Sequence, residues 1–154
     1  MNRRTFLGVS ALGSRAFALT AQSETPSLKP APVKTFELDE ITLSGLAEGM
    51  QSGKYTALSI TQKYLERIEE IDKRGPGLNS VIEINPDALA LAQKLDQERR
   101  EKQVRGPLHG IPVLIKDNID TADRMQTTAG SLALQGTPPT RDSKIGRASC
   151  RERV

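Results

Sequence analysis

The chain has 154 residues, enough for one domain of ordinary size. Aromatic residues make up only 3%, so a core must be built from Leu, Ile, Val and Ala. The net charge is +3, but Met1–Ala18 contributes +3 and Ile145–Val154 contributes +2, which leaves −2 for Leu19–Lys144. Because the basic residues lie at the two ends, this composition argues against nucleic-acid binding.

The first 23 residues have the order of an export signal. Arg3 and Arg4 precede a weakly apolar stretch, which Arg15 interrupts, and a small-x-small triplet ends at Ala18. The R-R-x-F-L pattern resembles a twin-arginine signal. We therefore expect a signal peptide over residues 1–23 that is read by the twin-arginine export machinery, and a periplasmic or extracellular bacterial protein. The alternative is a disordered basic tail.

No apolar run approaches the roughly 20 residues needed to cross a bilayer, so we expect no stable membrane anchor. Residues 24–37 are polar and rich in proline, which predicts an extended linker. The folded domain is expected to span residues 38–143.

Two helices are predicted at the start of this domain. Residues 42–51 have an apolar face at helical spacing, made of Leu43, Leu46, Ala47 and Met50. Thr42 is the predicted N-cap and Gly53 closes the helix. A longer helix starts at Thr56 and runs to about Lys73, where the Arg74–Gly77 turn stops it. Its apolar face is predicted from the spacing of Ile60, Tyr64, Ile68 and Ile71.

Two short strands flank a third helix. Val81–Ile84 and Ile111–Ile115 are the predicted strands, and Asn85 with Pro86 opens the helix between them. The order helix, helix, strand, helix, strand predicts a mixed α/β architecture with a crossover helix.

The last segment, residues 144–154, looks foreign to the fold. A back-translation of it resembles a common short-read sequencing adapter followed by a stop codon. We expect the authentic protein sequence to stop near Ser143, and the alternative is a genuine polar helix end. Resequencing the gene across these codons tests the expectation.

The chain has one histidine, His109, and one cysteine, Cys150. An internal disulfide and a His/Cys metal site are therefore impossible, and no carboxylate cluster has ligand spacing. The sequence predicts no metal and no other cofactor.

Lys116 directly follows the apolar strand Ile111–Ile115, and Asp117 and Asn118 come next. A lysine between apolar and polar surroundings can have its pKa lowered and then act as a base near neutral pH. The same position also suits a lysine whose charge simply reaches solvent, since the residues after it favour a turn. Spacing alone leaves both interpretations open and favours the second.

Several motifs around Lys116 bear on which interpretation of this lysine is correct. The run Gly106–Pro112, G-P-L-H-G-I-P, is followed by V-x-I-K-D-N and then by T-T-A-G-S from Thr127, and together they resemble the start of the amidase signature family. The resemblance covers about Leu38 to Asp142. It implies the N-terminal part of the amidase signature fold, a mixed β-sheet covered by helices, which is incomplete in this chain.

The resemblance also implies an activity. Members of the family hydrolyse the C–N bond of carboxylic amides with a Ser–Ser–Lys triad, and the lysine maps to Lys116. Both serines belong to a later segment that this chain does not contain, so the chain alone is expected to be inactive. The substrate would be a small-molecule amide, and Thr127, Thr128, Gly130 and Ser131 match a segment expected near the active site. Of these, Thr128, Gly130 and Ser131 are the expected substrate-binding residues.

Three neighbouring side chains are expected to have structural roles. Asp117 and Asn118 would brace the turn after the strand, and His109 would pack within a turn. Two other functions stay open at this point. One is the amidase-like subunit that amidates misacylated tRNA, a cytosolic task that the export signal counts against. The other is a non-catalytic α/β binding module, in which Lys116 is only a cation at a strand end.

Overall fold

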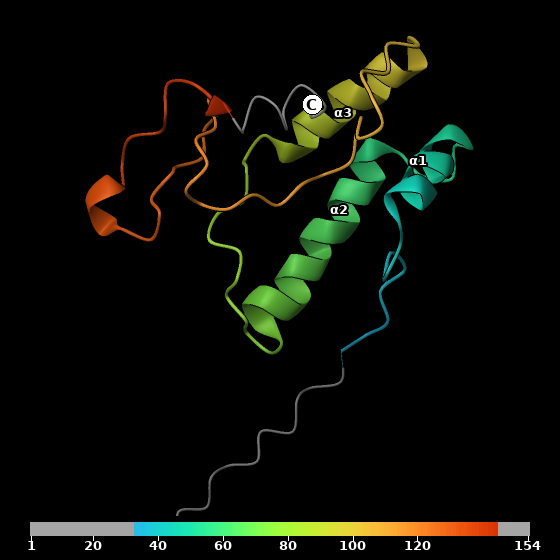
Figure 1. Ribbon diagram of the computed structural model, residues 1–154. Helices are drawn as coiled ribbons and strands as arrows, with labels where there is room; N and C mark the ends of the chain where they lie inside the picture. Colours follow the sequence, from blue (N-terminus) through green and yellow to red (C-terminus); the bar gives the residue numbers. More distant parts are fainter. Residues whose placement is uncertain (1–32, 145–154) are drawn as a thin grey trace, which may run out of the picture.

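A computed structural model describes residues 33–144 (Figure 1). The predicted signal peptide, the linker before Val33 and the predicted tail from Ile145 lie outside these residues. The helices are α1 (Leu43–Gln51), α2 (Ala57–Arg67) and α3 (Ala88–Arg100), with a π-helix (Ile68–Arg74) after α2 and a short 3-10 helix (Leu132–Leu134) near the end. Helix α2 packs against α3, and long irregular segments follow both the π-helix and α3 (Figure 1).

Side-chain caps begin the first two helices. The Thr42 hydroxyl accepts a hydrogen bond from the Gly45 N–H at 3.0 Å. The Thr56 hydroxyl accepts one from the Ser59 N–H at 3.0 Å, and the Ser59 hydroxyl oxygen accepts one from the Thr56 N–H at 2.9 Å. Such bonds satisfy N–H groups that have no partner inside the helix. Both predicted N-caps are confirmed.

The helix predicted up to Lys73 changes its geometry at Ile68, where the π-helix begins, and it ends at Arg74, the first residue of the predicted turn. The π-helix contains Asp72, a buried carboxylate. Asp72 accepts hydrogen bonds from the Ser80 N–H at 2.7 Å, from the Ser80 hydroxyl at 2.5 Å and from the Val81 N–H at 3.2 Å. It therefore holds the segment after the π-helix against the helix end.

This arrangement predicts a loss of stability in acid. The Ser80 hydroxyl, followed by the two backbone N–H groups, lowers the pKa of Asp72 from 3.8 to about 2. The unfolded chain therefore takes up this proton first, so the contribution of Asp72 is complete above about pH 4 and is lost as the pH falls through about 2. As the pH is lowered from about 4 to about 2, we expect the urea unfolding midpoint of the wild type to decrease more than that of Asp72→Asn. Equal pH dependence in both proteins would contradict the assignment.

The third helix starts later than predicted. Asp87 is its cap residue and makes no side-chain cap bond, so Pro86 is not the first helical residue. Asn85 instead accepts a hydrogen bond from the Asp87 N–H at 2.9 Å, within a turn. Asparagine side chains stabilise such turns as readily as helix starts, and here the turn forms.

The two predicted strands are not found as strands in residues 33–144. Both Val81–Ile84 and Ile111–Ile115 run without regular secondary structure, and Ile82 and Leu114 are 67% and 73% exposed. A strand needs hydrogen bonds to a neighbouring strand, and no other described segment supplies them. The helical part of the predicted fold is confirmed, while its sheet stays a prediction.

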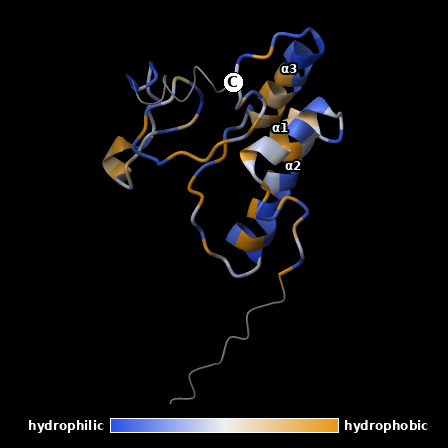
Figure 2. Ribbon diagram, turned by 45° about the vertical axis from the view of Figure 1, so that its right-hand side comes forward, coloured by the Kyte–Doolittle hydropathy of each residue, from blue (hydrophilic) through white to orange (hydrophobic). Residues whose placement is uncertain are grey.

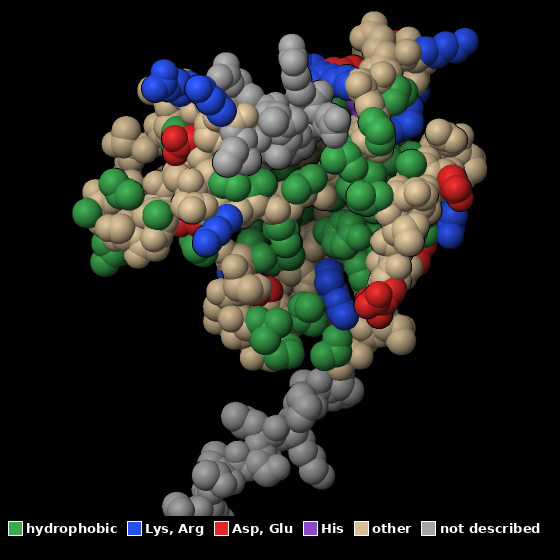
Figure 3. Space-filling model, viewed as in Figure 1, with side chains coloured by type: hydrophobic (Ala, Val, Ile, Leu, Met, Phe, Trp, Pro, Cys, Tyr) green, Lys and Arg blue, Asp and Glu red, His purple; other side chains and the backbone are tan. Residues whose placement is uncertain are grey.

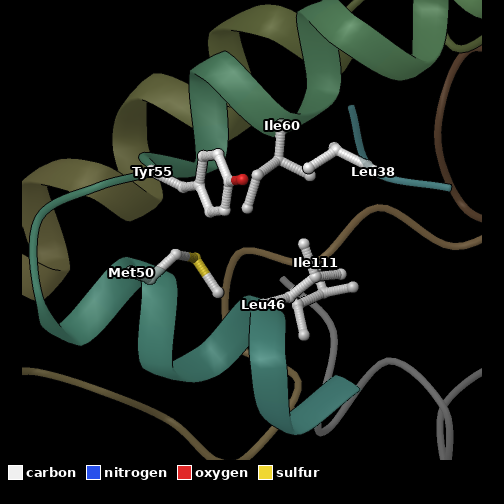
Figure 4. Packing of buried hydrophobic residues seen from close by; sticks show 6 residues of the cluster. All are labelled: Leu38, Leu46, Met50, Tyr55, Ile60 and Ile111. Atoms are coloured by element: carbon white, nitrogen blue, oxygen red, sulfur yellow. The ribbon is translucent and has the colours of Figure 1, made fainter. Parts of the chain in front are cut away.

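The core lies where α1, α2 and the start of the second predicted strand meet. Six buried side chains converge there, as Figure 4 shows: Leu38, Leu46, Met50, Tyr55, Ile60 and Ile111. Ile111 therefore fixes the beginning of the segment that leads to Lys116. A smaller cluster of Ala57, Ala92 and Leu95 joins α2 to α3. Leu43, predicted on the apolar face of α1, is exposed.

The end of the predicted linker lies against α2. The rings of Phe36 and Tyr64 have centroids 5.4 Å apart. Glu37 accepts hydrogen bonds from the Tyr55 hydroxyl at 3.1 Å and from the Lys63 ammonium at 2.7 Å. The Lys63 hydrogen bond, then that of Tyr55, lowers the pKa of Glu37. These contacts fix the entry of the chain into the helical part.

Apolar side chains are also exposed outside the core. Figure 2 shows hydrophobic residues along the irregular segments, and Figure 3 shows hydrophobic side chains gathered in the middle of one face. Among residues 33–144, no helix has the length and apolar character of a membrane span.

Candidate active site

Lys116 lies at the junction between the apolar segment that Ile111 begins and a tight turn. Its backbone carbonyl accepts a hydrogen bond from the Ile119 N–H at 3.0 Å, which closes the turn. The side chain is exposed, and its ammonium has no hydrogen bond or ion pair with any residue of 33–144. The amine is therefore available to groups that the described part of the chain does not supply.

Asp117 binds the loop of residues 127–131, which we call the TTAGS loop. Its carboxylate accepts hydrogen bonds from the Thr128 hydroxyl at 2.5 Å, from the Thr128 N–H at 3.2 Å and from the Gly130 N–H at 3.2 Å. The Thr128 hydroxyl, then its N–H, lowers the pKa of Asp117. The ionised carboxylate thus holds the TTAGS loop beside Lys116. The sequence predicted instead that Asp117 braces the turn after the strand, which is closed by the Ile119 N–H.

The TTAGS loop has a left-handed backbone at its centre, with φ +49° at Ala129 and +76° at Gly130. Successive N–H groups in such a turn can face one anion. Here that anion is Asp117, whose backbone carbonyl also accepts the Ala129 N–H at 3.2 Å. The N–H groups of Thr128, Ala129 and Gly130 are therefore already occupied within the chain.

The structure brings the three predicted substrate-binding residues together but gives them different surroundings. Thr128 and Gly130 use their polar groups on Asp117, and the Gly130 N–H also contacts the Thr128 hydroxyl at 3.2 Å. Ser131 donates its N–H to the Thr128 carbonyl at 2.8 Å, and its side chain is exposed. Of the three, Ser131 alone offers a side-chain group that makes no hydrogen bond within residues 33–144.

Thr127 belongs to the same matched segment, although the sequence did not predict that it binds the substrate. Its hydroxyl oxygen is buried and has no hydrogen-bond partner among the described residues. It lines a groove of about 740 Å³ between the turn of residues 118–120 and the segment of residues 133–141. Thr127 and Thr128 are neighbours of identical type, so only the fold distinguishes the free hydroxyl from the occupied one.

His109 is fully buried and has a structural role, as predicted. Its Nε2 lies 3.1 Å from the Leu95 carbonyl oxygen, and its Nδ1 lies 3.4 Å from the Arg105 backbone nitrogen. Since the carbonyl can only accept and the N–H can only donate, Nε2 is the donor to Leu95 and Nδ1 is the acceptor from Arg105. Arg99 adds a hydrogen bond to the His109 carbonyl at 2.8 Å. Together they tie α3 to the loop before Ile111.

The described part of the chain, residues 33–144, contains no group of three or more His, Cys, Asp or Glu side chains that could hold a metal ion.

A sequence model of the family named Amidase matches residues 59–148. This match ends inside the segment predicted to be artefactual. Among proteins compared by sequence, one from Schizosaccharomyces pombe that carries the name amidase is 38% identical, over 80% of this chain and 21% of its own length. A glutamyl-tRNA(Gln) amidotransferase subunit from Streptomyces coelicolor is 32% identical, over 71% of this chain and 21% of its own length.

Solved structures of amidases are also similar to this chain. The native peptide amidase from Stenotrophomonas maltophilia is 47% identical with a TM-score of 0.73, over 77% of this chain and 24% of that one. An amidase family protein from Bacillus anthracis is 40% identical with a TM-score of 0.71, over 75% of this chain and 23% of that one. The chain therefore spans about a fifth to a quarter of the length of these relatives.

Proposed function

Since the chain belongs to the amidase family, we propose that it is the N-terminal part of an enzyme that hydrolyses the C–N bond of carboxylic amides. The main structural support for this proposal is the environment of the Lys116 side chain. Its amine is exposed and unpaired among residues 33–144, and it stands between a segment that starts in the core at Ile111 and the loop that Asp117 holds.

In the proposed mechanism Lys116 is the terminal base of a Ser–Ser–Lys triad whose two serines lie outside this chain. The neutral amine takes a proton from a bridging serine, which takes one from the nucleophilic serine. The nucleophile attacks the amide carbonyl, the leaving amine receives the proton back through the same relay, and an ester intermediate remains. Water then attacks this acyl-enzyme and releases the acid.

The TTAGS loop is the proposed substrate contact beside this lysine. Thr128 and Gly130 give the loop its shape through their bonds to Asp117. Ser131, whose side chain is exposed, supplies a hydroxyl for a polar group of the amide. These three residues thus share one task, in which two of them position the loop and the third meets the substrate.

A chimera tests the proposal. Residues 33–144 replace the matched quarter of the Stenotrophomonas maltophilia peptide amidase, to which the chain is 47% identical. We expect the chimera to hydrolyse amides, and we expect Lys116→Ala to abolish this activity. Lys94→Ala, which changes an exposed lysine of α3, is the matched control and should keep the activity. A chimera that melts like its parent but hydrolyses no amide would contradict the proposal.

We also propose that the protein is exported through the twin-arginine machinery, on the pattern of Arg3 and Arg4 alone. The competing role in a cytosolic amidotransferase has support from the 32% identity to the Streptomyces coelicolor subunit. A Chloroflexus aurantiacus subunit of the same name is 38% identical, which equals the identity of the Schizosaccharomyces pombe protein. A fusion of residues 1–23 to a reporter that works only in the periplasm distinguishes the exported enzyme from the cytosolic subunit. We expect a signal that disappears when Arg3 and Arg4 are both replaced by lysine, and a signal that survives would remove the twin-arginine interpretation.

A further inference from the structure

The segment that leads to Lys116 is fixed at its start and free along its middle. Ile111, at the start, is 6% exposed and belongs to the core. The N–H groups of Val113, Leu114 and Ile115 make no hydrogen bond within residues 33–144, and Leu114 is 73% exposed. Within the described part of the chain, the position of the Lys116 backbone therefore depends on the residues that follow it.

Asp117 supplies this support with both its side chain and its backbone. Its carboxylate accepts hydrogen bonds from the Thr128 hydroxyl, the Thr128 N–H and the Gly130 N–H. Its backbone carbonyl accepts one from the Ala129 N–H at 3.2 Å. These bonds join the residue next to Lys116 to a loop that lies 11 to 13 residues further along the chain.

The TTAGS loop has a conformation that needs such a partner. Ala129 has φ +49°, in the left-handed region that costs an L-residue roughly 1–2 kcal/mol. Residues in such conformations persist where the surrounding contacts hold them there. Here three successive residues, Thr128, Ala129 and Gly130, all donate hydrogen bonds to Asp117. The loop and Asp117 therefore hold each other in place.

We propose that Asp117 is a positioning residue of the proposed reaction, which fixes the backbone of the base Lys116 by anchoring it to the TTAGS loop. This inference rests on the proposed function and adds to it a residue that acts through Lys116. Asp117 itself takes no part in the proton relay, because its oxygens are bound within the chain. Its effect on the rate is nevertheless large, since a displacement of about 1 Å can cost roughly a hundredfold.

Kinetics of the chimera distinguish this role from a role in substrate binding. Asp117→Asn should lower kcat roughly 10- to 100-fold, because its amide offers one acceptor oxygen to three donors and Lys116 loses its anchor. Ser131→Ala, which removes the proposed substrate contact, should mainly raise KM. If Asp117 only shaped the loop for the substrate, Asp117→Asn would behave like Ser131→Ala. A raised KM with unchanged kcat in Asp117→Asn would therefore overturn the proposal.

Asp72→Asn is the matched control. Asp72 accepts hydrogen bonds from the same kinds of donor, one hydroxyl and two backbone N–H groups, at a different place in the fold. Both variants should lower the melting temperature of the chimera, while Asp72→Asn should keep kcat unchanged. An equal loss of kcat in the two variants would assign both effects to stability and overturn the positioning role.

The anchoring itself can be measured on the 154-residue chain without catalysis. The observable is the order parameter of the Lys116 amide in ¹⁵N-labelled protein. We expect about 0.85 in the wild type, as for rigid backbone, and less than about 0.6 in Asp117→Asn. Thr128→Val, which removes the hydroxyl donor, should also lower it, and this variant replaces Asp117→Asn if the spectrum of the latter shows that it fails to fold. A Lys116 amide that is equally mobile in the wild type and the variants would overturn the proposal.

The two measurements separate this inference from the proposed function. A chimera that hydrolyses no amide, in a protein whose Lys116 order parameter still depends on Asp117, would reject the proposed function and leave the anchoring in place. An active chimera whose kcat is unaffected by Asp117→Asn would reject the positioning role alone.

Discussion

Replacing Lys116 by arginine should abolish amide hydrolysis although the positive charge is kept. A terminal base must lose its proton in each cycle, and a guanidinium cannot be deprotonated in a protein. We expect kcat/KM of the chimera to fall roughly a thousandfold or more, as when a member of a catalytic triad is removed. Lys116→Met, which keeps an unbranched apolar stem without the amine, should cause a similar loss.

Lys116→Arg and Lys116→Met together distinguish a catalytic base at position 116 from a residue that only carries a positive charge. If Lys116 only balanced charge or reached solvent at a strand end, arginine would replace it and activity would survive. The amine makes no hydrogen bond or ion pair within residues 33–144 and the side chain is exposed, so both variants should melt like the unmodified chimera. Lys94→Arg on α3 is the control for the substitution itself. An active Lys116→Arg enzyme would remove Lys116 from the relay.

The second large effect concerns stability. Asp96→Ala should lower the free energy of unfolding by about 2–4 kcal/mol, because hydrogen bonds to charged groups and charges at helix ends are among the stronger contributions. The Asp96 carboxylate lies on α3 and accepts hydrogen bonds from the Ala57 N–H at 2.6 Å and the Leu58 N–H at 3.0 Å. Both donors belong to the first turn of α2, and Asp96 itself is buried. Its loss would leave the start of α2 with buried, unpaired N–H groups.

Urea unfolding followed by circular dichroism measures this effect. Asp87→Ala is the matched control, since Asp87 stands at the start of α3 without a side-chain cap bond and pairs with Arg124 at the surface. It should cost less than about 1 kcal/mol, as exposed ion pairs do. Asp96→Asn keeps one acceptor oxygen and should fall between the two. Equal losses for Asp96→Ala and Asp87→Ala would contradict the capping role.

The sequence by itself determined the elements whose signals are local. Thr42 and Thr56 cap helices because their hydroxyls reach N–H groups three residues away, and the turn from Arg74 stops the second helix where predicted. The motif around Lys116 was equally informative, because its residues are contiguous and the family match covers them. Periodicity also identified Leu46 and Ile60 as core residues.

Tertiary structure decided everything that depends on a partner far along the chain. Asp96 begins a run of charged and polar residues in the sequence, and yet it lies buried under α2 because the packing of α3 brings it there. Asp117 accepts a hydrogen bond from the Thr128 hydroxyl, while the hydroxyl of the neighbouring Thr127 makes none among the described residues. The local sequence does not distinguish these two threonines. Val81–Ile84 and Ile111–Ile115 have strand-like composition but no ladder within residues 33–144, since strand hydrogen bonds come from a neighbour and a helix supplies its own.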